Sequence, residues 1–188
     1  MPLPIGVKAM KSLGARFCTV AIALAVCLAV CAGAQAARVG METKSLKGLV
    51  GVCVVVESLA PDLVRDGLST GSLQKTIAAH LTAAGVGMLT EDELSQPGAA
   101  IFYISISSVK NDAGLYACNI HAEVIQAAAL TRDPKILTPA TTWTSSTVGI
   151  VGAANVKQLN QTVADMADEF IRDYLSVNSK QQLKPKIA

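Results

Sequence analysis

Apolar and polar residues alternate over two neighbouring stretches in the middle of the chain. The first runs from Ala100 to Val109 and the second from Leu115 to Leu130. A period of two residues is typical of strands with one buried face and one wet face. The segment 110–114 between them has turn composition. The pattern predicts a β-hairpin, with polar side chains on the wet face of its second strand.

Further strands are predicted on either side of this hairpin. Residues 49–59 are rich in β-branched side chains and apolar at nearly every position, which is typical of a strand buried on both faces. Residues 139–151 combine threonines with the single tryptophan, Trp143, and follow a turn at residues 132–134. The short apolar run 86–89 is a candidate fifth strand.

Two segments have the 3.6-residue apolar period of amphipathic helices. In residues 73–84 the apolar positions form one stripe, and Thr70 is the expected N-cap. In residues 155–177 the apolar positions line one face over about six turns. Asn155 is expected to open this helix, with Gln158 in the capping-box position.

The order of these elements predicts the fold class. We expect an α+β two-layer sandwich, in which a largely antiparallel sheet of about five strands carries two main helices on one face, in the order β-α-β-β-β-β-α. Each helix has one apolar stripe, so both can pack on the same face of the sheet. Thr90 and Glu93 form a capping-box pair that predicts a single helical turn before Pro97. A single domain is expected over residues 37–178, followed by a polar tail over residues 179–188.

The first thirty-six residues have the three parts of a secretory signal. Three basic residues precede the apolar run 17–30, and the small residues Ala34 and Ala36 flank the expected cleavage site. We therefore expect residues 1–36 to be a signal peptide that is cleaved after Ala36. The protein would then be exported to the periplasm or the extracellular space.

Two other interpretations of this segment stay open. Residues 17–36 are just long enough to span a bilayer, so an uncleaved signal would anchor the protein in the inner membrane. Cys31 could be lipidated, but Val30 stands where a lipobox has a small residue. Translation could also start at Met10, because Lys11 follows it and opens a more ordinary signal.

Removing the signal changes the charge and leaves one domain's worth of chain. The full sequence has 16 Lys and Arg against 14 Asp and Glu; three basic residues leave with the signal, so basic and acidic residues nearly balance. No basic stripe interleaved with aromatic residues is present, and nucleic acid is therefore not an expected partner.

Two cysteines, Cys53 and Cys118, remain after the signal is removed. They could be free thiols in the core, or they could form a disulfide in an oxidising compartment.

No set of residues has the spacing of a catalytic, cofactor or metal site. The chain has no G-x-S-x-G or H-E-x-x-H motif. His80 lies at the edge of the first helical stripe, where a local partner is the simplest expectation. The expectation is therefore a protein that is not an enzyme, with no cofactor and no metal.

The candidate interaction surface comprises Tyr103, Asn119, His121, Glu123 and Trp143. The first four lie on the predicted wet faces of the hairpin. His121 between Asn119 and Glu123 could form a polar or metal-binding patch, but ligands from one strand face do not close a metal site. Trp143 could be an exposed platform, although the core is the favoured place for a lone tryptophan.

Three segments resemble a group of uncharacterised exported bacterial proteins: residues 51–57, 116–132 and 168–178. The element order is also similar to that of small envelope accessory proteins, namely the lipopolysaccharide-assembly lipoprotein and the N-terminal domains of curli-secretion-type lipoproteins. The first resemblance implies no known activity. The second is an analogy at the level of the fold, and the poor lipobox departs from it.

Three functional hypotheses follow. The first is a non-catalytic periplasmic or envelope accessory protein that binds a protein partner or itself, by strand addition or by an apolar patch. The second is a small-ligand carrier with a pocket between sheet and helices. The third is a hydrolase that uses His121 or His80. Contact with a membrane is expected only through an uncleaved N-terminal segment.

Overall fold

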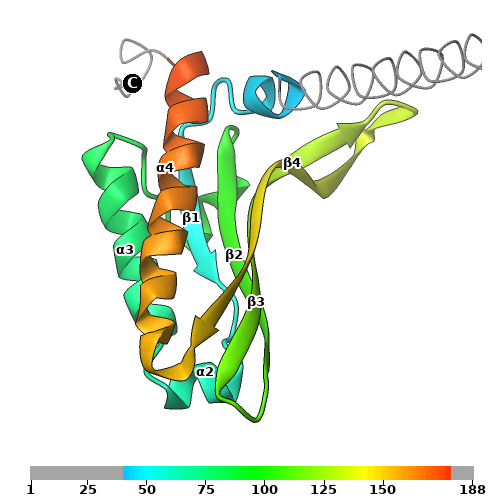
Figure 1. Ribbon diagram of the computed structural model, residues 1–188. Coiled ribbons are helices and arrows are strands. Elements are labelled where there is room, and N and C mark those ends of the chain that lie inside the picture. Colours follow the sequence, from blue (N-terminus) through cyan, green and yellow to red (C-terminus); the bar gives the residue numbers. More distant parts are fainter. Residues whose placement is uncertain (1–39, 179–188) are drawn as a thin grey trace, which may run out of the picture. The chain divides into compact units, whose positions relative to one another are not determined.

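The computed structural model describes residues 40–178 (Figure 1). The predicted signal peptide, its cleavage site and the polar tail lie outside the described residues. Within residues 42–178, four strands form one sheet in the order β1-β2-β3-β4. The strands are β1 (Gly51–Val56), β2 (Ala99–Lys110), β3 (Leu115–Leu130) and β4 (Asp133–Gly152). β1 is parallel to β2 and the other pairs are antiparallel, so the α+β class and the largely antiparallel sheet are confirmed.

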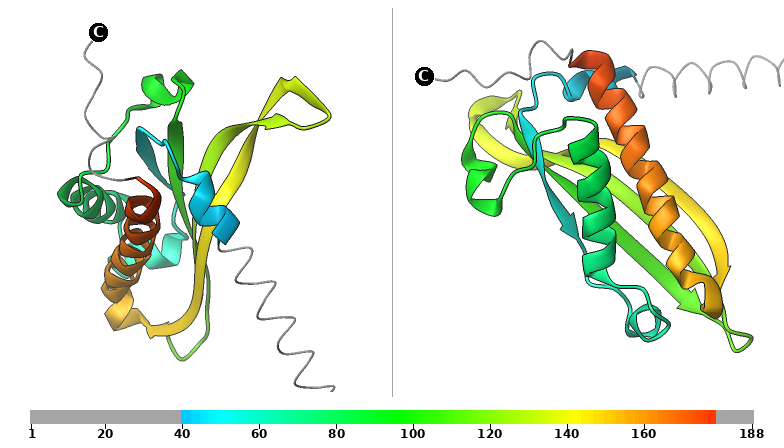
Figure 2. Two further views of the ribbon diagram at one scale, coloured as in Figure 1. Left: turned by 90° about the horizontal axis from the view of Figure 1, so that it is seen from above. Right: turned by 90° about the vertical axis from the view of Figure 1, so that its left-hand side faces the viewer.

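The helices connect and cover these strands. They are α2 (Pro61–Arg65), α3 (Thr70–Ala83) and α4 (Leu159–Val177), with two 3-10 helices, η1 (Glu91–Ser95) and η2 (Ala153–Gln158). Residues 40–45, ahead of β1, are helical as well. α3 and α4 lie side by side over one face of the sheet (Figure 2). This arrangement follows from their single apolar stripes, because each helix can bury only one side.

Three boundaries differ from the sequence prediction. Residues 86–89 form one isolated bridge, between Val52 and Met88, in place of a fifth strand. The N-cap of α3 is Ser69, whose hydroxyl accepts the Ser72 N–H. In addition, the connection before α3 contains the short helix α2, which begins at Pro61.

The last helix begins later than Asn155, and the predicted capping box is absent. Residues 153–158 form the 3-10 helix η2, and α4 starts at Leu159. A 3-10 helix has three residues per turn, which places residues three apart on the same side. Val156 and Leu159 are both buried, so the tighter turn lets both reach the core.

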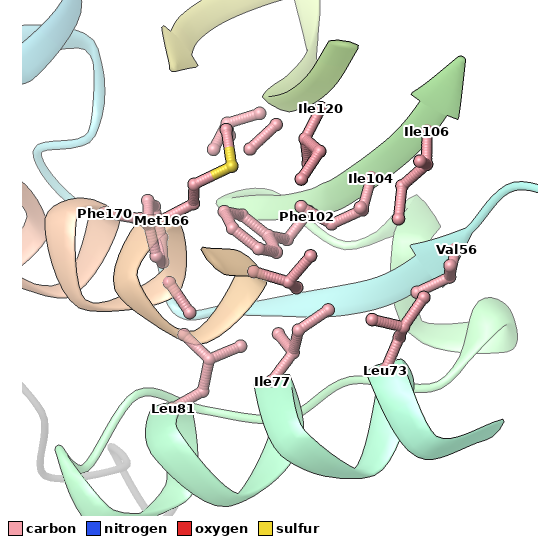
Figure 3. Close-up of a cluster of buried hydrophobic side chains, with 14 of the residues drawn as sticks. Val56, Leu73, Ile77, Leu81, Phe102, Ile104, Ile106, Ile120, Met166 and Phe170 are labelled. Carbon is pink, nitrogen blue, oxygen red and sulfur yellow. The ribbon is translucent and has the colours of Figure 1, made fainter. Parts of the chain in front are cut away.

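Four aromatic rings form the centre of the core between sheet and helices. Phe170 of α4 lies 5.0 Å from Phe102, 5.6 Å from Trp143 and 5.8 Å from Tyr174, measured between ring centroids. Leu73, Ile77 and Leu81, the stripe of α3, point toward the same layer (Figure 3). The space around these rings, between sheet and helices, is therefore filled by side chains.

A polar contact joins the residue after α2 to the end of the sheet where β2 turns into β3. The carboxylate of Asp66, which follows α2, accepts bonds from Lys110 Nζ at 2.7 Å and from the Tyr116 hydroxyl at 2.6 Å. The bond from Lys110, and next that from Tyr116, lower the pKa of Asp66. Both bonds favour the ionised carboxyl.

Acid should therefore destabilise the protein partly through Asp66. A carboxyl whose folded-state pKa is lowered stabilises the fold above its unfolded pKa of about 3.9, and this contribution disappears as the pH falls through the folded value. We expect the urea midpoint of Asp66→Asn to fall less between pH 5 and pH 3 than that of the unchanged protein. Asp112→Asn, at an exposed turn position, is the control. Equal pH dependence of the Asp66→Asn variant and the unchanged protein would contradict this assignment.

Candidate interaction face of the sheet

The side of the sheet opposite α3 and α4 carries no helix of the described chain over its centre. Alternation along each strand sends one set of side chains into the core and the other set to this side. We call the second set the outer face. It consists of Tyr103, Ser105, Ser107 and Val109 of β2, Ala117, Asn119, His121 and Glu123 of β3, and Thr144, Ser146, Val148 and Ile150 of β4.

The strand register brings four of the five predicted surface residues together on this face. Tyr103 is opposite Glu123, and His121 and Asn119 follow at two-residue intervals along β3. The alternation of apolar and polar residues along the hairpin strands is enough to predict that these four side chains share one face. That this face binds a partner stays a prediction.

The polar centre of the outer face is held by weak and local contacts. His121 Nε2 lies 3.8 Å from Glu123 Oε2, and the same carboxylate oxygen accepts the Thr141 hydroxyl at 2.7 Å. Burial, and next the charge of Glu57, raise the pKa of Tyr103. Within residues 40–178 no group of three or more His, Cys, Asp or Glu side chains could hold a metal ion. The described side chains at the centre thus offer hydrogen-bonding groups.

One end of the outer face is apolar and exposed. Val109, Val148 and Ile150 are 73%, 78% and 76% exposed. Val109 and Ile150 flank Ala117 in one row across three strands, and Val148 lies two residues along. These three residues are not among the predicted surface residues. Their positions are in phase with the wet face, and only their apolar character is unexpected there.

A groove of about 210 Å³ lies near the other end of the outer face. β3 and β4 run on past β2 as a two-stranded arm (Figure 1), and the groove lies beside this arm and η1. Its lining is mostly apolar and includes Leu94, Ile101, Ile125, Leu137 and Pro139. Ile101 and Ile125 are opposite each other in register, in phase with Tyr103 and Glu123, so the groove opens on the outer face.

Trp143 is not part of this surface. It is 2% exposed, and it packs against Phe102 and Phe170 on the helix side of the sheet. Its Nε1 donates to Asp173 of α4 at 2.8 Å. The platform hypothesis for Trp143 is wrong because the strand phase at this position points into the core, where the largest apolar side chain buries the most area.

The disulfide hypothesis for Cys53 and Cys118 is also wrong. Both are buried free thiols, and burial raises the pKa of each. Their β2 partners, Ile101 and Ser108, are seven residues apart, which corresponds to about 23 Å along a strand. A disulfide needs Cα atoms within about 7 Å.

His80 has the local partner that its position predicts. Its Nδ1 lies 2.7 Å from Asp168 Oδ1, and the pair links the exposed sides of α3 and α4. This contact belongs to the helix layer and not to the outer face.

The geometry defines an α+β two-layer domain with one helix-covered face and one open face. No family model and no curated protein matches the sequence. Among solved structures, a minor lipoprotein from Acinetobacter baumannii is 14% identical, with a TM-score of 0.34, over 69% of this chain and 93% of that chain. PelC from Paraburkholderia phytofirmans, solved as a dodecamer, is 16% identical, with a TM-score of 0.38, over 63% of this chain and 87% of that chain. Likenesses this distant carry no argument about function. Among the described residues, no helix is long and apolar enough to span a membrane.

Proposed function

We propose that the protein is a non-catalytic accessory protein of the cell envelope that binds a protein partner through the outer face. The observation that carries this proposal is the apolar end of that face. Val109, Val148 and Ile150 are all more than 70% exposed on the side of the sheet that α3 and α4 leave open. Exposed apolar groups that gather on one face are typical of interaction sites.

The composition of the rest of the face supports a protein partner. Its polar centre, with Tyr103 and His121, supplies hydrogen-bonding groups between two apolar ends. Protein interfaces combine apolar contacts with a moderate number of hydrogen bonds in this way. The groove of about 210 Å³ is smaller than the roughly 300–1,000 Å³ of ordinary small-molecule pockets, and it suits an apolar side chain of a partner.

The other two hypotheses have weaker support. A ligand carrier would need a pocket between sheet and helices. Phe102, Ile104 and Phe170 are fully buried and fill the centre of that layer. The cavity of about 180 Å³ between β4 and α4 is smaller than ordinary small-molecule pockets of roughly 300–1,000 Å³. A hydrolase would need a nucleophile hydrogen-bonded to a histidine. Ser105 and Ser146 lie opposite His121 in the strand register, but the contacts of His80 and His121 in the described chain are with the carboxylates of Asp168 and Glu123. An envelope location is supported by the three-part signal pattern of residues 1–36.

An in-cell pull-down with two matched variants tests the proposal. The full chain with a C-terminal tag is expressed, crosslinked in intact cells and purified, and captured proteins are quantified by mass spectrometry. Val109→Glu places a charge on the apolar end of the outer face, and Val64→Glu makes the same change on α2, where Val64 is 52% exposed. Exposed substitutions of this kind change stability by about 0.5 kcal/mol or less.

We expect Val109→Glu to reduce capture of the envelope partner at least tenfold, while Val64→Glu leaves it unchanged. A buried charge without a counterion is costly in an interface, which gives the large effect. Equal capture by both variants, or no envelope protein captured by the unchanged chain, would contradict the proposal.

A further inference from the structure

β4 is the last strand of the sheet, so within residues 40–178 no strand lies beside one of its two edges. At the edge of β4 that faces β3, the Ala153 N–H donates to the Gly114 carbonyl at 2.9 Å. This bond determines which residues of β4 hydrogen-bond to β3. Antiparallel strands alternate hydrogen-bonded and non-hydrogen-bonded pairs. The backbone groups of Val151, Gly149 and Thr147 therefore point to β3.

The residues that alternate with these three have backbone groups that point away from β3. They are Ser146, Val148 and Ile150, and each directs one N–H and one C=O to the free edge. Farther along β4, the free edge is already in use, because the Thr142 carbonyl accepts the Ser45 hydroxyl at 3.0 Å. The open part of the edge is therefore a short segment centred on Val148.

This segment lacks the features that usually protect a free edge. Natural edge strands carry charged side chains, proline or bulges that block pairing with another chain. From Ile136 to Val156 the sequence contains no charged residue, and its one proline, Pro139, lies in the arm and not in the open segment. The bulge of β4 lies between the Trp143 and Thr141 pairs, also outside it. The segment is thus a neutral, β-branched edge that can meet an identical edge without charge repulsion.

We propose that this edge pairs antiparallel with β4 of a second copy of the chain, with Val148 opposite Val148 on the two-fold axis. In this register Ser146 pairs with Ile150 of the other copy, and Ile150 pairs with its Ser146. All the outward backbone groups of the segment are then hydrogen-bonded among themselves. A register shifted by two residues would pair Ile150 with Thr144, beside the Thr142 carbonyl that Ser45 already occupies, or Ser146 with Gly152 at the end of the strand.

The side chains on both faces are compatible with this pairing. On the outer face, Val148 of the two copies are direct neighbours and each Ile150 lies diagonal to the other Val148, so the most exposed apolar residues of β4 cover one another. On the helix side, Thr147 lies opposite Gly149 of the other copy, and a Cβ on Gly149 would meet nothing within 4 Å. A cavity of about 180 Å³ between β4 and α4 adjoins both residues. The contact is isologous, as expected of a two-fold dimer.

The inference goes beyond the proposed function, because it names a second copy as the occupant of the edge of β4. The outer-face partner of the proposed function would bind across the apolar ends of the two outer faces, which the pairing brings side by side. Pairing would join two four-stranded sheets into one, with two outer faces on the same side. A protein partner would then meet two copies of the binding face.

Single cysteines introduced on β4 test the register directly. The full chain is expressed with a C-terminal tag, and the purified product is oxidised and resolved on a non-reducing gel. Val148→Cys should form a covalent dimer, because directly opposite Cα atoms lie about 5.5 Å apart. Ser146→Cys alone should not, because the two copies of residue 146 lie about 14 Å apart. A mixture of Ser146→Cys and Ile150→Cys should form the heterodimer. Cys53 and Cys118 are 7% and 3% exposed and should not contribute.

Light scattering of the same preparation measures whether the pairing occurs without a crosslink. The unchanged chain should have twice the mass of a single copy. Val148→Pro should be monomeric, because proline removes the N–H on the free edge without removing a bond to β3, and Val148→Thr should remain a dimer. The proposal is overturned if the unchanged chain is monomeric, if Val148→Cys forms no covalent dimer, or if Ser146→Cys crosslinks to itself as readily. These outcomes are independent of partner capture by Val109→Glu.

Discussion

Phe170→Ala is expected to lower the free energy of unfolding by about 3–5 kcal/mol, as large-to-small changes of buried aromatic residues do. Phe170 is fully buried, and its ring contacts three other aromatic rings, those of Phe102, Trp143 and Tyr174. The cavity left behind would lie between α4 and the sheet, where rigid rings on three sides limit collapse. The loss in free energy of unfolding should therefore lie at the upper end of what substitutions in α4 cause.

Urea unfolding followed by tryptophan fluorescence measures this loss, since Trp143 borders the same site. Arg172→Ala, two residues along α4 and exposed, is the control and should change the free energy by about 0.5 kcal/mol or less. If Phe170→Ala were as stable as Arg172→Ala, the aromatic cluster would not be the centre of the core.

Gly51→Ala is expected to destabilise the protein by about 1–3 kcal/mol through overpacking. A Cβ at this position would lie 2.5 Å from the Gly87 carbonyl oxygen and 2.8 Å from its carbon. These are backbone atoms, so no side chain can move aside. Gly51 has no positive φ, and the cost is therefore one of space alone.

The close approach exists because residues 86–89 run against β1 at a single bridge. Gly71→Ala, at the start of α3 with nothing within 4 Å of its Cβ, is the matched control and should be neutral or stabilise by up to about 1 kcal/mol. A Gly51→Ala variant as stable as Gly71→Ala would show that β1 and this segment do not pack so closely.

The hairpin alternation predicted the most. It gave β3 from Leu115 to Leu130 as observed, and it placed Asn119, His121 and Glu123 on the outer face. A period of two residues determines which face each side chain occupies once one face is buried. This is why the polar centre of the outer face could be found without coordinates.

Other features depend on contacts that the sequence pattern does not contain. Met88 touches β1 at one bridge because Gly51 and Gly87 permit the approach, and no local periodicity signals it. The start of α4 moved from Asn155 to Leu159 because burial of Val156 outweighs the capping signal. The sequence has threonine and tryptophan in β4 but gives no indication of which edge of the sheet β4 occupies, and the free edge at Val148 follows from that order.

The helix layer and the outer face therefore have different roles in this account. α3 and α4 stabilise the sheet through the core, and we propose that the open side, with Val109, Asn119 and Val148, contacts other molecules. This division follows from packing, because α3 and α4 each bury their single apolar face against the same side of the sheet.

A photo-crosslinking amino acid placed at single positions of the full chain in living cells tests this division most directly. Asn119, at the centre of the outer face, is compared with Lys75, on the exposed side of α3; both side chains are exposed. The account predicts a discrete crosslinked protein band from position 119 and none from position 75. A band from position 75 with none from position 119 would contradict it, because the binding surface would then lie on the helix layer.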